Sequence, residues 1–100
     1  MKVAWTEQAL ERLQEIEDFI AQDSPKRAVD FVNKLIDRGD KVGPFPHAGR
    51  VVPELASNEI REVLEGNYRI VYRITPKRIE ILTVFDGHRQ IPVSDIPLKA

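Results

Sequence analysis

The segment 60–89 constrains the fold of this 100-residue chain more than any other. It holds three runs rich in β-branched and aromatic residues, separated by the turn signals GN and TPK. In the middle run, YRIVYRI, successive side chains should point to opposite faces of a sheet. Tyr68 and Tyr72 would then face a core, while Arg69 and Arg73 face the other way. We therefore expect one sheet face covered by helices and an opposite face whose guanidinium groups are free to contact another molecule.

Two helices are predicted before these strands. Thr6 is a good N-cap, and apolar residues follow it at helical spacing to about residue 22. Asp23-Ser24-Pro25 ends this helix and begins a second one, which Gly39 interrupts and Gly43-Pro44 stops. A short strand over Lys2–Trp5 precedes the hairpin. We expect Trp5 and Phe19, as well as the two tyrosines, to lie in the core.

A long connection and a proline-containing tail complete the chain. Residues 43–59 carry three prolines and two glycines, and loops of this length in small domains are often functional. After Asp86-Gly87, Pro92 and Pro97 restrict the tail to an edge strand or an irregular path. The order β, α, α, β, β, β predicts a single α+β domain over residues 1–100. Its helical hairpin would pack on one face of a mostly antiparallel, three- to four-stranded sheet.

Composition excludes several classes of protein. With 42% hydrophobic and 31% charged residues the chain is globular, and its net charge of −1 does not favour a general polyanion binder. Without cysteine it has neither disulfides nor thiolate metal sites, and its two histidines lack clustered carboxylates, so we expect no metal. No apolar run approaches the roughly 20 residues that span a bilayer, and the N-terminus has no signal-peptide core. We expect a cytoplasmic protein with no membrane contact.

An ordered set of motifs resembles one known family. The helical joint reads IAQDSPKRA, and FPHAGRVVPEL, IREVLEGNYRIVYRI and ILTVFDGHR follow in that order. Together they resemble the RelE/ParE toxins of type II toxin–antitoxin systems across nearly the whole chain. The blocks GRVVPEL and IREVLEGNYRIVYRI are most similar to the ParE branch.

This resemblance implies a growth-inhibiting toxin, of the kind that stabilises plasmids, that is neutralised in a hetero-oligomer by a cognate antitoxin from a neighbouring gene. ParE-like members poison DNA gyrase without catalytic residues or cofactors of their own. On this reading the C-terminal segment and several cationic residues would contact the target. They are Arg50, Arg61, Arg69, Arg73, His88 and Arg89.

The alternative within the family is a RelE-like, ribosome-dependent endoribonuclease acting on messenger RNA. Resemblance would then assign phosphate binding to Arg69 and Arg89, proton transfer to His88, and a second acid–base role to Glu54. Two departures favour the non-catalytic branch. The residues EIRE at 59–62 replace a lysine pair, and no tyrosine follows Tyr72.

Two further interpretations need no such activity. The chain could be a degenerate toxin that only binds its antitoxin. The arginines could also form a solvated sheet face, paired with Glu62, Glu65 or Glu80.

Overall fold

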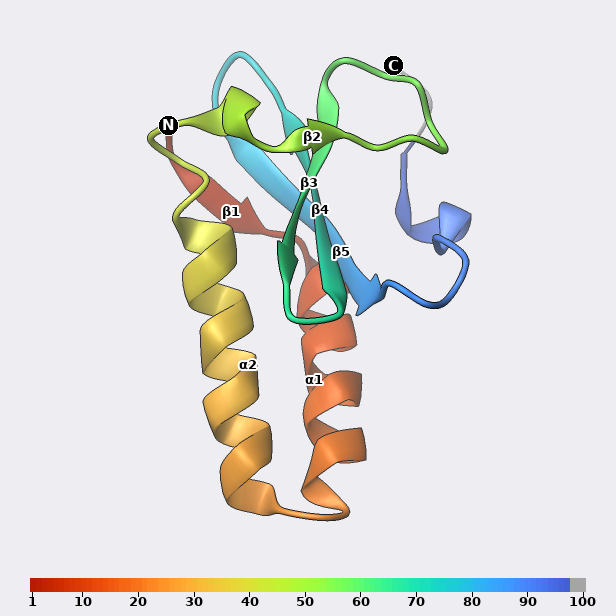
Figure 1. Cartoon of the computed structure of the whole chain (residues 1–100). Helices are drawn as coiled ribbons and strands as arrows, with labels where there is room; N and C mark the ends of the chain where they lie inside the picture. The colour runs from red at the N-terminus through yellow and green to blue at the C-terminus, as the bar shows by residue number, and fades with distance from the viewer. Residues whose placement is uncertain (98–100) are drawn as a thin grey trace.

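The computed structural model describes residues 1–97 and confirms the α+β class, with two helices packed on one face of a five-stranded mixed sheet (Figure 1). The long elements are α1 and α2, followed by the strands β3, β4 and β5. Their bounds are α1 Glu7–Ala21, α2 Pro25–Asp40, β3 Ile60–Glu65, β4 Tyr68–Ile74 and β5 Ile79–Asp86. The short elements are β1 Val3–Trp5, β2 Arg50–Val51 and the 3-10 turns η1 Pro46–Ala48 and η2 Val93–Asp95.

The strand order is β1-β5-β4-β3-β2, with β1 parallel to β5 and all other neighbours antiparallel. The sheet has more strands than the sequence predicts, because Arg50–Val51 inside the long connection pairs with β3. The predicted two-residue turn joins β3 to β4, and Gly66 adopts a φ of +59° there, which only glycine adopts without strain. β5 is an interior strand, as its apolar character indicated.

Local signals set the ends of the helical hairpin. The side chain of Thr6 accepts a hydrogen bond from the Ala9 backbone, and Ser24 does the same for Arg27, so both helices are capped at their N-termini. The prediction that Gly39 interrupts the second helix is wrong, because α2 runs through this residue to Asp40. A Cβ atom at Gly39 would stand 2.5 Å from the Trp5 ring, so glycine permits β1 to approach the helix closely.

The helices cover the face of the sheet that was predicted to be apolar. Tyr72 and Ile70 of β4 are fully buried and belong to one cluster with the inner faces of both helices. Trp5 packs against this cluster from β1. The expectation for Phe19 is wrong, because it lies at the border of the apolar stripe and is 69% exposed.

The opposite face of the sheet is covered as well. A second apolar cluster joins Val71 of β4 to Val52 of the long connection and to two residues of the C-terminal segment, Ile91 and Ile96. The expectation of an open arginine-bearing face is therefore wrong, because segments distant in sequence fold across it. The tail follows an irregular path, as predicted, and its last residues, 98–100, lie outside the described part of the chain.

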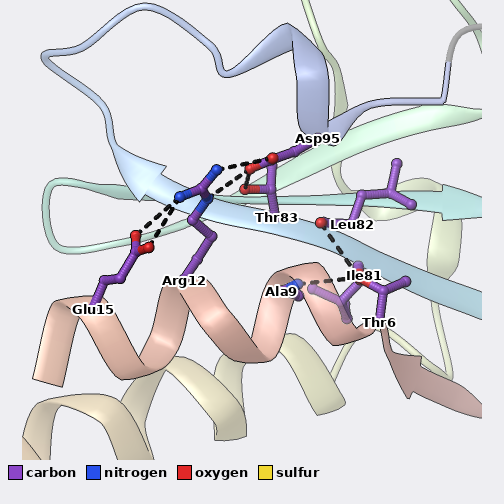
Figure 2. Close-up of polar contacts among 8 residues, drawn as sticks. All are labelled: Thr6, Ala9, Arg12, Glu15, Ile81, Leu82, Thr83 and Asp95. Atoms are coloured by element: carbon purple, nitrogen blue, oxygen red, sulfur yellow. Dashed lines mark hydrogen bonds and ion pairs between the residues drawn. The ribbon is translucent and has the colours of Figure 1, made fainter.

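Asp95 ties the C-terminal segment to the body of the protein (Figure 2). Its side chain is 2% exposed and accepts two hydrogen bonds from Arg12 of α1, at 2.8 and 3.0 Å, and one from the hydroxyl of Thr83 at 2.8 Å. Arg12 also pairs with Glu15 at 3.0 Å. Burial raises the pKa of Asp95, but the bonds from Arg12 and Thr83 outweigh it, so this pKa lies below its ordinary value.

Candidate functional site

Arg69 is the centre of an ion-pair network on the sheet face away from the helices. Its Nη1 and Nη2 each donate to one carboxylate oxygen of Glu54 at 2.8 Å, and its Nε donates to Glu62 at 2.6 Å. Arg50 pairs with the other oxygen of Glu62. The guanidinium of Arg69 also lies 4.9 Å from the centroid of the Phe85 ring. Three nitrogens of Arg69 therefore already have carboxylate partners within the chain.

Because the centre of this ion-pair network is buried, the network contributes to the packing of the sheet face as well as to its charge. The side chains of Glu62 and Arg69 are 0% and 9% exposed, whereas Glu54 is 40% exposed at the rim. Hydrogen bonds from Arg69 lower the pKa of Glu54 from 4.5 to about 2, and the bonds to Glu54 raise the pKa of Arg69. The network joins two arginines to two glutamates.

Arg61 lies on the other side of β3 and holds the long connection in place. Its Nη1 donates to the backbone carbonyls of His47 and Gly49 at 3.1 and 3.0 Å. Its Nε and Nη2 bind Asn58. Through these bonds the guanidinium of Arg61 orders the connection between α2 and β3.

The other predicted site residues are Arg73, His88 and Arg89. Arg73 stands 3.9 Å from Glu80, and its Nε is buried without a hydrogen-bond partner. His88, with 76% of its side chain exposed, contacts Asp86 through Nδ1 at 2.9 Å. Arg89 is exposed just beyond β5. The structure thus brings Glu54 next to Arg69 and places His88 and Arg89 just beyond the end of β5, after Gly87, which lies close to the Arg69 side chain.

Two adjoining hollows lie where the helical joint meets the sheet. The larger, of about 560 Å³, has an apolar floor of Phe19, Ile20, Phe31 and Tyr68. Charged residues of both signs border it, namely Asp23, Arg27, Asp30 and Lys34. The second, of about 380 Å³, shares Phe19 and Tyr68 and continues past Phe85 and Arg89 to Pro92 of the tail. The hollows form one amphipathic groove, which we call the hairpin groove.

No pattern in the sequence indicated which residues line the hairpin groove or that Glu62 is buried. Because Phe19 fits the helical apolar pattern, the sequence predicts it in the core. In the structure it is exposed and lines the groove. The complete burial of Glu62 has no local signal. Arginines do pair with Glu62 and Glu80, but the interpretation of a solvated face is wrong for Arg69 and Glu62, because both side chains are buried. Within residues 1–97 no cluster of His, Asp and Glu side chains could hold a metal ion, and no helix there is long and apolar enough to span a membrane.

Comparison with known proteins establishes the family. The family described as "ParE toxin of type II toxin-antitoxin system, parDE" matches residues 3–91. The chain belongs to this family of toxins. The curated protein named "Putative toxin Y4kP" from Sinorhizobium fredii is 34% identical over 91 residues, which cover 91% of this chain and 93% of that protein.

Solved structures agree with the fold of ParE toxins. A chain of the chromosomal ParDE system from P. aeruginosa superposes with a TM-score of 0.72 at 20% identity, covering 86% of this chain and 95% of that one. A chain of the RelBE2 toxin–antitoxin complex from Mycobacterium tuberculosis gives a TM-score of 0.54 at 23% identity, covering 85% and 95%. At these identities the likeness shows a shared fold. Together with the family match and the relative Y4kP, it confirms the resemblance to RelE/ParE toxins.

Proposed function

We propose that this ParE-family toxin inhibits growth by binding DNA gyrase and trapping it on cleaved DNA, without catalytic residues of its own. The observation that carries this proposal is the saturation of Arg69. A ribonuclease would need that guanidinium to neutralise a crowded phosphate, yet Glu54 and Glu62 occupy three of its nitrogens. A phosphate would have to displace one carboxylate and lie near the other, which repels it.

The position of His88 supports the same choice. General acid–base catalysis requires the titrating group within hydrogen-bond reach of the atom that it serves. His88 projects from the turn after β5 and bonds to Asp86, while Glu54 and Arg69 pair with each other across the sheet face. The polar atoms proposed for RNA cleavage are therefore engaged in separate pairs, His88 with Asp86 and Arg69 with Glu54 and Glu62.

We also propose that a cognate antitoxin neutralises the toxin by laying an amphipathic segment into the hairpin groove. Apolar side chains of the segment would pack on Phe19 and Tyr68, and its charges would meet Arg27 and Lys34 at the rim. The solved relatives are described as toxin–antitoxin systems, which supports a partner of this kind. A gene for a short protein with a DNA-binding N-terminus and a disordered tail is expected beside this one.

The gyrase proposal is tested with purified toxin, gyrase and relaxed plasmid. We expect loss of supercoiling and accumulation of cleaved plasmid, both reversed by the antitoxin. Unchanged supercoiling together with codon-phased cleavage of messenger in a translation extract would favour the ribonuclease alternative. Growth that is unaffected by expression without antitoxin would instead indicate a degenerate, antitoxin-binding module.

The groove is tested by comparing two exposed apolar residues of α1. Phe19→Ala should weaken antitoxin binding by at least about tenfold, since buried aromatic anchors dominate such interfaces. Leu10→Ala is the matched control, because Leu10 is 52% exposed on the same helix and does not line the groove. Equal affinities of the two variants, measured by calorimetry, would exclude the groove as the antitoxin site.

A further inference from the structure

The loop from Pro44 to Arg50, which we call the Phe45 loop, presents an unusual side chain. Phe45 is 74% exposed, the highest value among the exposed large hydrophobic residues of positions 1–97. It stands between Pro44 and Pro46 at the start of η1. An isolated exposed apolar residue needs no explanation by itself. Phe45 is distinguished by the bonds that hold the loop carrying it.

Side chains from the sheet fix this loop in one conformation. The hydroxyl of Tyr72 donates to the carbonyl of Pro46 at 2.6 Å, and Arg61 donates to the carbonyls of His47 and Gly49. Gly49 is buried so closely that a Cβ atom there would lie 2.2 Å from the Tyr72 hydroxyl oxygen. Immediately beyond, Arg50 is tied to β3 by its pair with Glu62 and by strand pairing.

A loop that merely connects α2 to β3 does not need these bonds, because lengthening a flexible loop costs little free energy. Ordering a loop in advance does have value for binding, since the partner then does not bear the entropic cost of fixing it. Two prolines beside the aromatic residue act in the same direction by restricting the backbone. The Phe45 loop is therefore built like the rigid anchor of a protein interface.

The chemistry of the loop indicates what it binds. Residues 41–50 include Lys41, His47 and Arg50 and no acidic residue, and the Arg50 side chain is 60% exposed. A projecting phenyl ring with basic neighbours complements an apolar pocket with an acidic rim. Such a pocket must exist before binding, so it belongs to a folded protein. A disordered antitoxin tail has no preformed pocket and suits a groove instead.

The position of the loop separates it from the hairpin groove. In Figure 1 the yellow-green turn η1 lies beside the N-terminus, whereas the joint between α1 and α2 lies at the opposite end of the molecule. The groove is lined by residues around that joint. One surface can thus serve the antitoxin while the other serves a second protein.

We propose that the Phe45 loop is the anchor by which the toxin grips its folded protein target, with Phe45 inserted into an acid-rimmed apolar pocket. This inference rests on the proposed function, because it assumes that the toxin acts by binding a target. It adds a residue that the family resemblance did not assign and places it on a surface distinct from the groove.

The test compares Phe45→Ala with wild type and with Leu64→Ala, whose side chain is 51% exposed on β3 outside both surfaces. The Phe45→Ala protein should fold normally, because little of the ring is buried, and circular dichroism and thermal melting verify this. We expect growth arrest and gyrase inhibition to need at least about tenfold more Phe45→Ala than wild type. Phe45→Trp should restore most of the activity. Both Phe45 variants should bind the antitoxin with the wild-type affinity.

The outcomes distinguish this inference from the proposed function. Growth arrest by Phe45→Ala at the wild-type dose would overturn the inference and leave the toxin function standing. Loss of antitoxin affinity in Phe45→Ala would overturn it also, by assigning the loop to the antitoxin. Wild type that arrests growth without affecting gyrase would refute the gyrase proposal, and a defect of Phe45→Ala in that arrest would still support the anchor. Wild type without any effect on growth would overturn both.

Discussion

Replacing Arg69 with methionine tests whether the ion-pair network supports the fold. The substitution keeps a long apolar stem next to Phe85 but leaves the carboxylate of Glu62, which is 0% exposed, with Arg50 as its only partner. Removing one member of a buried ion pair typically costs about 3–5 kcal/mol, because the remaining charge stays desolvated. At about 4–8 °C per kcal/mol for a domain of this size, the melting temperature should fall by at least about 12 °C.

The double variant Arg69→Met/Glu62→Met should recover much of this loss. Without either charge, no buried ion remains, and Arg50 can turn to solvent because it is already 60% exposed. Replacing a whole buried pair by apolar groups is often neutral, so we expect the double variant within about 2 kcal/mol of wild type. Urea unfolding of the four proteins of the cycle at pH 7 measures the coupling.

The control is Glu54→Gln, which removes the half-exposed partner. Glu54 is 40% exposed, so its pair with Arg69 is screened by solvent and should contribute about 1 kcal/mol or less. Arg69→Met that unfolds at the wild-type midpoint, or a double variant as unstable as the sum of the singles, would refute the structural role. Arg69 would then have to be reconsidered as a ligand-binding residue.

Three other outcomes are expected. Asp95→Asn should lower stability by about 1–3 kcal/mol and increase proteolysis of the C-terminal segment, because its charged bonds to Arg12 are lost; unchanged proteolysis would exclude this clamp. Gly39→Val should lower the free energy of unfolding by more than about 1 kcal/mol, because the new Cβ would lie 2.5 Å from the Trp5 ring. A wild-type melting temperature would contradict this contact. Stability should be constant from pH 7 to 5 and fall below about pH 4.5, because the unfolded chain then binds protons that Glu54, with a pKa of about 2, does not bind when folded. Urea midpoints against pH measure this fall, and Glu54→Gln should reduce it.

Elements with local signals were predictable from the sequence. Alternation along β4 placed Tyr72 under the helices, and the caps at Thr6 and Ser24 follow from the hydrogen bonds that their side chains offer to free backbone groups. The turn at Gly66 follows from its need for positive φ. Each of these features depends on residues within a few positions of one another.

Features that depend on distant segments were not predictable. Nothing near Arg69 shows that the connection carrying Glu54 folds back over it, 15 positions earlier in the chain. Nor does the tail reveal that Asp95 reaches Arg12 across 83 positions. The sequence predicts an open arginine-bearing face because alternation shows on which side of the sheet a residue lies. It does not show which distant segments cover that side.

The parallel pairing of β1 with β5 has a consequence for synthesis. The hydroxyl of Thr6 bonds to the carbonyl of Ile81, 75 positions later, so the first strand has no partner until nearly the whole chain has left the ribosome. The helical hairpin can form early because its contacts are local, whereas sheet closure waits for long-range pairing. The nascent chain thus cannot complete its sheet until its last strand emerges. An antitoxin already present in the cell can then meet the toxin at the moment of its completion.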